Sequence, residues 1–217
     1  VQNIGAYGQE AKDSIVSCLV YDLSTKTFSW IDNKDCHFDY RYSIFKYQKG
    51  NLVIWKVRFS LSKHFTVNTS YKALKEEIDK VEDKSMITPS FVAKKVTEIR
   101  DKKLPDPRFL GNVGSFFKNP IIPQEQYEMI RQHYPNIVSF QAKDGVKISA
   151  GWLIEQCGYK GKCVGKLGMS ERQALVMVNY GEATGKEIIS FANAIIDSVK
   201  NLFNITINIE AHIVSNH

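Results

Sequence analysis

Residues 111–120 read GNVGSFFKNP and place Ser115 between two flexible glycines and a block of apolar, cationic and amide side chains. Glycine permits positive φ angles, adjacent phenylalanines favour burial, and proline ends a regular element. The simplest interpretation is a turn that enters a buried strand, with Ser115 incidental. The alternative is a backbone shaped to hold a hydroxyl group against a ligand.

The residues before this stretch predict a strand-rich region. Residues 13–23 (DSIVSCLVYDL) form an apolar run, residues 26–32 (KTFSWID) alternate, and the turn between them predicts a hairpin. In residues 51–62 (NLVIWKVRFSLS) the alternation predicts that one face of a strand is apolar. That face carries Val53, Trp55, Val57, Phe59 and Leu61.

Helical patterns occur on both sides of LPDP (residues 104–107), where we place a domain boundary. The expected helices lie within residues 69–83, 88–103, 123–135, 149–158 and 184–204. Thr88 and Pro89 predict the start of the second helix, and Thr184 with Glu187 predicts a capping box on the last. The buried stripe of the last helix should be Ile188, Phe191, Ile195, Val199 and Leu202.

A final strand is expected in residues 205–214. Its alternation places Ile205, Ile207 and Ile209 inward and Glu210 outward. The mixture of strands and helices predicts an α+β fold.

The composition excludes several classes of protein. With 43% hydrophobic and 24% charged residues among 217, the chain is typical of globular proteins. No apolar run reaches the roughly 18 residues of a membrane span, and no signal peptide precedes the first strand. The net charge of +6 suits anionic ligands, but the basic residues are dispersed, which argues against a nucleic-acid binder. The chain begins at Val1, so we expect a fragment or a processed chain.

The cysteines predict a reducing, cytoplasmic environment. Cys18, Cys36, Cys157 and Cys163 contain no CxxC pair, and no histidine lies near Cys157 and Cys163. We expect free thiols and no metal site.

Three polar residues stand in unusual surroundings. Arg41 lies among aromatic and apolar residues, Glu210 follows an apolar alternation, and Ser115 is the third. A cation, a carboxylate and a hydroxyl could together serve an anionic intermediate, although their distant positions do not establish a site.

Six segments occur in an order and spacing that resemble one family. They are QNIGAYGQE, YRYSIFK, KLPDP, GNVGSFFKNP, SAGWLIEQCGYKG and RQALVMVN. Together they closely resemble the bacterial cell-wall family of UDP-N-acetylenolpyruvoylglucosamine reductases over essentially the whole chain. The family's glycine-rich GGGSN-type loop, which holds the flavin pyrophosphate, does not occur here. The sequence therefore resembles the carboxy-terminal two-thirds of such an enzyme.

The resemblance implies a reaction and its catalytic residues. NADPH reduces FAD, the flavin passes a hydride to the enolpyruvyl ether of UDP-N-acetylglucosamine enolpyruvate, and an enzyme acid protonates the carbon next to the carboxylate. Fixed cationic and hydrogen-bonding groups must stabilise the intermediate. The resemblance assigns the cation to Arg41, the proton donor to Ser115 and a stabilising carboxylate to Glu210.

Other residues follow by the same matching. Tyr71, Lys103, Asn119 and Gln173 should line the UDP-sugar or NADPH pocket, and Ile4, Gly5, Ile54 and Arg100 should touch FAD. One local departure from the family is Phe140, which stands where a tyrosine is expected.

The domain organisation is also implied by the resemblance. Residues 1–104 should be the remainder of the FAD-binding region, joined by a returning strand at 205–217, and residues 105–204 a smaller α+β substrate domain. Without the amino-terminal pyrophosphate-binding domain, we expect this chain alone to bind FAD weakly and to be inactive. We expect a monomer that binds neither nucleic acid nor membrane. The rival interpretation is a UDP-sugar-binding module without catalysis.

Overall fold

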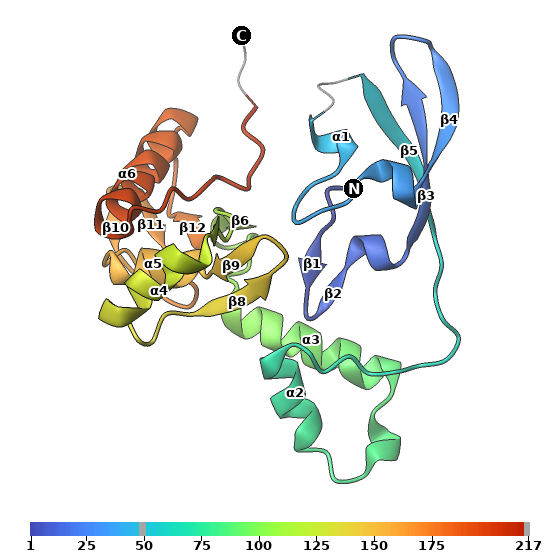
Figure 1. Ribbon diagram of the computed structural model, residues 1–217, viewed down its shortest axis with the longest axis horizontal. Helices are drawn as coiled ribbons and strands as arrows, with labels where there is room; N and C mark the ends of the chain where they lie inside the picture. Colours follow the sequence, from blue (N-terminus) through green and yellow to red (C-terminus); the bar gives the residue numbers. More distant parts are fainter. Residues whose placement is uncertain (48–50, 215–217) are drawn as a thin grey trace. The chain divides into compact units, whose positions relative to one another are not determined.

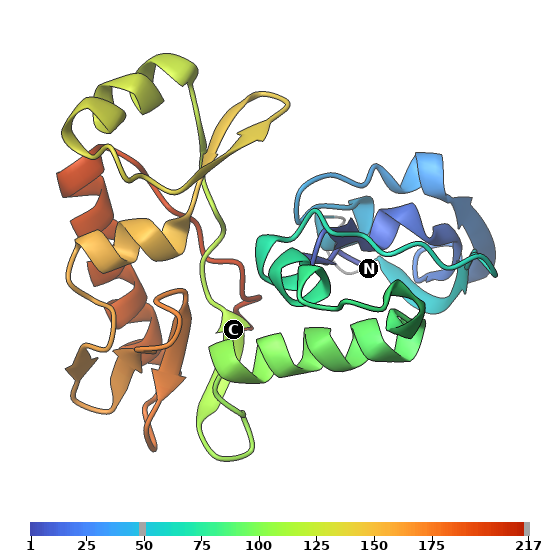
Figure 2. The same cartoon turned by 90° about the horizontal axis from the view of Figure 1, so that it is seen from below.

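The computed structural model describes residues 1–47 and 51–214. The chain divides into two compact units, Val1–Ile99 and Arg100–His217, and the division falls within one helix. Both units mix helices with antiparallel strands (Figure 1, Figure 2). The α+β prediction is therefore confirmed.

The first unit is built on a three-stranded antiparallel sheet in the order β4-β3-β5 (Figure 1). Its strands are β3 (Ile15–Asp22), β4 (Thr27–Asp32) and β5 (Leu52–Phe59). A small two-stranded sheet precedes it, made of β1 (Gly5–Ala6) and β2 (Gln9–Glu10). Short helical turns follow, at Ala11–Asp13, Asn33–Cys36, Lys84–Met86 and α1 (Ile44–Tyr47).

The predicted apolar face of residues 51–62 was wrong except at Val57. Leu19 of β3 pairs with Lys56, and the next residue, Val20, pairs with Ile54, so Trp55 is an extra residue in the strand. This β-bulge shifts the alternation of inward- and outward-facing side chains by one residue. Ile54 and Val57 both pack against the core as a result, and Trp55 is 63% exposed. Val53, Phe59 and Leu61 are exposed as well.

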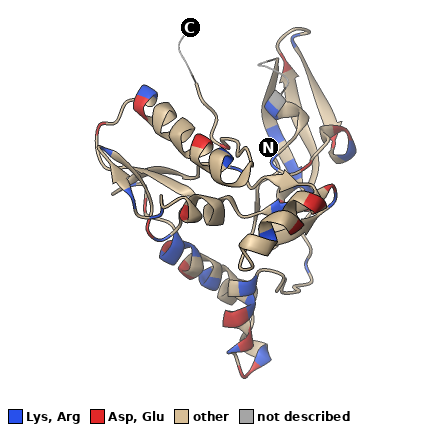
Figure 3. Ribbon diagram, turned by 60° about the vertical axis from the view of Figure 1, so that its left-hand side comes forward, with Lys and Arg blue, Asp and Glu red and all other residues tan. Residues whose placement is uncertain are grey.

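Two helices complete the first unit, α2 (Lys72–Asp79) and α3 (Pro89–Lys103), the latter continuing into the second unit. As predicted, Thr88 caps α3, since its hydroxyl accepts the Phe91 N–H at 3.2 Å. Both basic and acidic residues lie along these helices (Figure 3). Lys95 pairs with Glu77 at 3.3 Å, so these charges belong to a solvated, paired surface.

The second unit contains two antiparallel sheets with the orders β10-β11-β12-β6 and β7-β9-β8. The strands are β6 (Gly111–Ser115), β7 (Ile121–Ile122), β8 (Ser139–Ala142), β9 (Gly145–Ile148), β10 (Cys163–Val164), β11 (Leu167–Met169) and β12 (Val176–Asn179). The helices are α4 (Gln124–His133), α5 (Ala150–Gln156) and α6 (Gly185–Phe203). Both sheets and all three helices contribute to one apolar core.

The capping box of α6 is confirmed, because Thr184 and Glu187 exchange their hydrogen bonds. One predicted core residue is wrong: Leu202 is 47% exposed, and Phe203 at 5% takes the buried place. The helix ends at Phe203, and the left-handed Asn204 follows it.

Residues 205–214 form an extended segment with a single bridge, between Phe117 and Ile209, so the predicted final strand was too long. The alternation itself is confirmed, since Ile205 and Ile207 are buried in the core of the second unit and Ile209 packs against it. Glu210 is half-buried, where the alternation predicted an outward-facing residue. None of the helices in the described part of the chain has the length and apolar character that a bilayer crossing requires.

Candidate functional site

Ser115 is the last residue of β6, and its support is fixed by buried neighbours. It pairs with Val176 of β12, and the following residue, Phe116, donates its N–H to the Leu175 carbonyl at 2.8 Å. Phe116 and Phe117 are buried and pack edge to face at 5.2 Å between ring centroids. The exposed Ser115 thus stands on a rigid, apolar base, as the sequence predicted.

Glu210 lies on a segment that runs beside this base. Its N–H donates to the Phe116 carbonyl at 2.8 Å, and the Lys118 N–H donates to the Asn208 carbonyl at 2.8 Å. Ser115 and Glu210 are 95 positions apart in the sequence. Ser115 is bonded to Phe116 as its neighbour in the chain, and Glu210 is hydrogen-bonded to the Phe116 carbonyl. The structure therefore places the backbone of Glu210 beside the residue that follows Ser115, and a shared catalytic role for their side chains stays a prediction.

Asn119 and Gln173 meet at the first turn of α5. The Asn119 side-chain oxygen accepts the Ala150 N–H at 2.9 Å, which satisfies one of the backbone donors that every helix start leaves open. Gln173 Oε1 would lie 2.9 Å from a Cβ atom placed on Gly151. Side-chain amides held at a helix start can donate and accept hydrogen bonds, the chemistry needed to contact phosphate or sugar oxygens.

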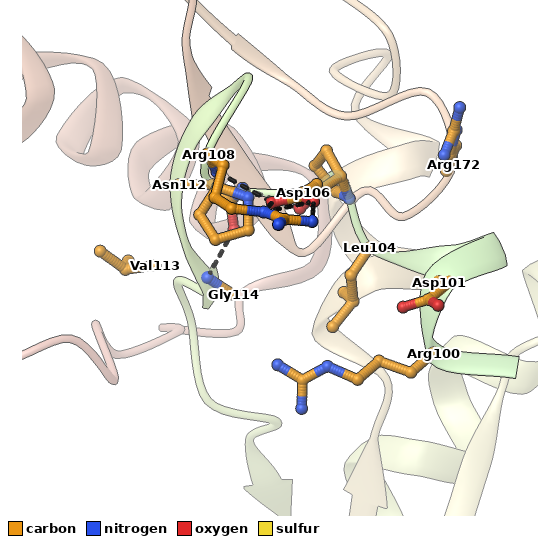
Figure 4. Close-up of a pocket in the computed structure, with 11 residues that line it drawn as sticks. Arg100, Asp101, Leu104, Asp106, Arg108, Asn112, Val113, Gly114 and Arg172 are labelled. Atoms are coloured by element: carbon orange, nitrogen blue, oxygen red, sulfur yellow. Dashed lines mark hydrogen bonds and ion pairs between the residues drawn. The ribbon is translucent and has the colours of Figure 1, made fainter. Parts of the chain in front are cut away.

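A cavity of about 650 Å³ lies in the second unit beside the strand that carries Ser115 (Figure 4). Arg100 lines it, as do Arg108, Arg172 and Gly114. Arg108 forms a forked pair with Asp106, with Nη2 at 2.6 Å from Oδ2, and these hydrogen bonds hold the pKa of Asp106 below its ordinary value. Within residues 1–47 and 51–214, Arg100 and Arg172 have no ion pair, so the cavity suits an anion.

Lys103 is the last residue of α3, in the same unit as this cavity, and it is half-buried. Arg108, Arg172 and Asn112 were missed by the sequence reasoning, although all three line the cavity. The sequence offered one signal for them, which is their position beside residues already singled out. Arg108 directly follows LPDP, Asn112 lies three residues before Ser115, and Arg172 directly precedes Gln173.

Arg41 occupies the first unit, with Ile4, Gly5 and Ile54, whereas Arg100, the fourth residue predicted to touch FAD, belongs to the second unit. The Nη2 atom of Arg41 donates to the Gly5 carbonyl at 2.8 Å. Ile4 is 64% exposed beside this glycine. Gly5 lets Arg41 and Glu10 approach the backbone closely, since a Cβ atom there would lie 3.0 Å from Arg41 Nη1 and 3.2 Å from Glu10 Cγ. An exposed apolar side chain beside a cation is a surface that could contact one face of a flavin ring.

The other predicted residues of the first unit have structural contacts. Tyr71 packs edge to face on Tyr7 at 5.1 Å, and Ile54 packs against the apolar cluster of the sheet. Arg41 belongs to the first unit and Ser115 and Glu210 to the second, so the assembly of all three stays a prediction. The four cysteines are free thiols, and the described residues contain no cluster of three potential metal ligands.

Comparison with known proteins identifies the family. Residues 106–214, half of the chain, match the family described as UDP-N-acetylenolpyruvoylglucosamine reductase, C-terminal domain. The reductase of that name from Flavobacterium johnsoniae is 43% identical over 217 residues, which cover 99% of this chain and 64% of the relative. The reductase from Pseudomonas savastanoi pv. phaseolicola is 41% identical over 215 residues, covering 98% of this chain and 63% of the relative.

The fold agrees with a solved structure. The crystal structure of the reductase from Thermus caldophilus matches 97% of this chain and 57% of its own, with a TM-score of 0.58 and 20% sequence identity. The chain spans less than two-thirds of the length of these relatives. The resemblance seen in the sequence is confirmed, and the chain belongs to the UDP-N-acetylenolpyruvoylglucosamine reductase family.

Proposed function

We propose that this chain carries the substrate-binding and proton-donating part of an NADPH-dependent flavoenzyme of the cytoplasm. The reaction would reduce the enolpyruvyl ether of UDP-N-acetylglucosamine enolpyruvate to the lactyl ether of UDP-N-acetylmuramate, a step in peptidoglycan precursor synthesis. The observation that carries the proposal is the attachment of Ser115 and Glu210 to the same buried residue, Phe116, inside the domain that matches the family.

The chemistry divides between the cofactors and the protein. The flavin, when bound, supplies the hydride that it has taken from NADPH. Addition of a hydride to the terminal alkene carbon leaves negative charge on the adjacent carbon and its carboxylate. Ser115 would then give its hydroxyl proton to that carbon, so that a hydride and a proton together saturate the double bond.

Arg41 would pair with the substrate carboxylate, where the negative charge grows. Its guanidinium group is already held by the Gly5 carbonyl, so little reorganisation is needed during the reaction. Glu210 would orient the donor side of the site, since its backbone is fixed beside Ser115.

Asn119 and Gln173 would hold the UDP-sugar. Amide groups fixed at α5 can donate hydrogen bonds to the pyrophosphate or sugar oxygens, and Lys103 and Tyr71 would add a cation and a phenol. Ile4, Gly5, Ile54 and Arg100 are the residues proposed to contact FAD. We expect a monomer.

A binding and a turnover experiment test the proposal. We define the chimera as residues 1–217 placed after the amino-terminal part of the Flavobacterium johnsoniae relative, the part that this chain does not match. Calorimetry should show that the 217-residue chain binds UDP-N-acetylglucosamine enolpyruvate, and the chimera loaded with FAD should oxidise NADPH when that substrate is added. Binding without NADPH oxidation would favour a non-catalytic UDP-sugar module instead.

A further inference from the structure

The strand that carries Ser115 contains a β-bulge directly before it. Val178 of β12 pairs with Asn112 and Val176 pairs with Ser115, so one residue of β12 faces two residues of β6, Val113 and Gly114. Side chains alternate along a strand, and one extra residue reverses the alternation. Ser115 therefore points to the face that residue 114 would occupy in a regular ladder.

Gly114 makes the bulge through its backbone conformation. Its φ angle is +74°, in the left-handed region that glycine tolerates best. Among the described residues, no atom outside its chain neighbours lies within 4 Å of the position of a Cβ atom on Gly114. A side chain at this position would meet no neighbour, so the cost of a substitution there would come from the backbone conformation itself.

Asn112 makes hydrogen bonds to the bulge and to a neighbouring loop through its side-chain amide (Figure 4). Its Oδ1 accepts the Gly114 N–H at 3.0 Å, and its Nδ2 donates to the Pro105 carbonyl at 3.1 Å and to the Leu110 carbonyl at 2.8 Å. One amide group thus joins the bulge to the loop at residues 105–110. The N–H of Gly114, which a bulge removes from the regular ladder, is satisfied in this way.

No other side chain of similar size can make this set of bonds. Aspartate has the same shape, but it would place a carboxylate oxygen against two carbonyl oxygens and lose both donors. Alanine would leave the Gly114 N–H and both carbonyls without this partner. The chemistry of an amide is therefore needed at position 112.

We propose that Asn112 is the positioning residue for Ser115, and that it acts by fixing the bulge at Gly114. The inference rests on the proposed function, in which Ser115 is the proton donor. It assigns a role to a residue that has no place in the chemistry itself, since Asn112 acts through Gly114.

The first test uses the 217-residue chain and measures hydrogen–deuterium exchange of backbone amides by NMR. Asn112→Ala should raise the exchange rate of the Gly114 amide about tenfold or more, because that amide loses its acceptor. Asn112→Asp keeps an acceptor for the Gly114 N–H, so it should raise the exchange rate of the Gly114 amide less than Asn112→Ala does.

Asn33→Ala is the matched control. Asn33 also donates from Nδ2 to two carbonyls, those of Lys12 and Ile15 at 2.8 and 2.7 Å, but it lies in the first unit. The Asn33→Ala variant should therefore leave the exchange rate of the Gly114 amide unchanged. Equal exchange at Gly114 in the wild-type chain and in Asn112→Ala would overturn the role of Asn112.

The second test compares half-reactions in the chimera. Asn112→Ala should slow reduction of the enolpyruvyl ether about 100-fold, within the range of general acid catalysis, and leave flavin reduction by NADPH unchanged. If Asn112 acts through Ser115, the double variant Asn112→Ala with Ser115→Ala should be no slower than Ser115→Ala alone.

Independent, multiplying effects of the two substitutions would contradict the positioning role. A wild-type chimera that binds FAD but does not reduce the enolpyruvyl ether would contradict the proposed function itself. The exchange measurement still decides in that case whether Asn112 holds the bulge, so the two failures are distinguishable.

Discussion

The backbone N–H of Glu210 donates to the carbonyl of Phe116 at 2.8 Å, and this bond fixes the carboxyl-terminal segment beside the residue that follows Ser115. Phe116 is 4% exposed, so the bond is sheltered from water and is costly to break. The position of the Glu210 backbone relative to the Ser115 backbone is therefore fixed by a hydrogen bond to a buried residue of the core. The proposed proton donor and the proposed carboxylate therefore lie on neighbouring backbone segments of one unit.

Gly114→Ala should strain the bulge. A left-handed φ of +74° costs a residue with a Cβ atom about 1–2 kcal/mol, and urea unfolding should show a loss of that size. Gly185→Ala is the control, because no atom lies within 4 Å of its Cβ position and no left-handed φ is required; it should be neutral or stabilising by up to about 1 kcal/mol. Equal stabilities for the two variants would contradict the strained bulge.

Gly151→Ala should weaken substrate binding more than it weakens the fold. The new Cβ would lie 2.9 Å from Gln173 Oε1, the end of a flexible side chain, which can move aside and take its amide out of position. Loss of one hydrogen bond predicts a Kd for UDP-N-acetylglucosamine enolpyruvate that is raised about 3- to 10-fold by calorimetry. An unchanged Kd would remove Gln173 from the proposed binding site.

Glu10→Gln should lower stability in a pH-dependent way. Burial acts to raise the pKa of Glu10, but hydrogen bonds from Lys12 and Asn3 and the charges of Lys12 and Arg41 outweigh it and lower the pKa below 4.5. A lowered folded-state pKa gives stability that is present above the unfolded value and is lost as pH falls through the folded value. Urea unfolding should therefore separate the variant from wild type near neutral pH.

The stabilities of the two proteins should converge once the pH has fallen below the folded-state pKa of Glu10. Glu171→Gln, an exposed position of the second unit, is the control and should follow the wild-type curve. A stability difference that persists at low pH would show that Glu10 acts by packing and not by charge.

Thiol labelling should distinguish the four cysteines. Burial raises the pKa of Cys18 and Cys157, and burial together with the Cys18 thiol raises the pKa of Cys36 to about 12. Cys163 is exposed, so native protein should show one fast reaction with Ellman's reagent, abolished by Cys163→Ser. Fast labelling of Cys36 in folded protein would contradict its burial.

Element types were largely predictable from the sequence, but the faces of strands were not. The hairpin of β3 and β4, the capping box at Thr184 and the cap at Thr88 follow from local chemistry. The bulges at Trp55 and at Val113–Gly114 depend on pairing with another strand, which a single strand's alternation does not contain. The exchange of Leu202 for Phe203 has another cause: Leu202 lies three residues after Val199 and Phe203 four, and both spacings fit the same helix face.

The site was predictable only in part. The resemblance assigned roles to Ser115 and Glu210, and the structure shows that the Glu210 backbone is hydrogen-bonded to Phe116, the residue after Ser115. Asn112 belongs to no catalytic sequence motif, so sequence reasoning had no reason to select it. Its three hydrogen bonds depend on the fold of the loop at 105–110 against β6. Short strands such as β8 and β9 were missed because residues 139–148 contain too few alternating apolar positions.

The central claim is that Ser115 donates the proton that completes substrate reduction, and Ser115→Ala in the chimera tests it most directly. Stopped-flow absorbance can follow flavin reduction by NADPH and flavin reoxidation by UDP-N-acetylglucosamine enolpyruvate separately. Flavin reduction needs no proton from Ser115 and should keep its wild-type rate. Reoxidation should slow by about 10²–10⁴-fold, or roughly 3–5 kcal/mol of barrier, with little change in UDP-sugar affinity. Equal slowing of both half-reactions would show that Ser115 is a packing residue and would contradict the account.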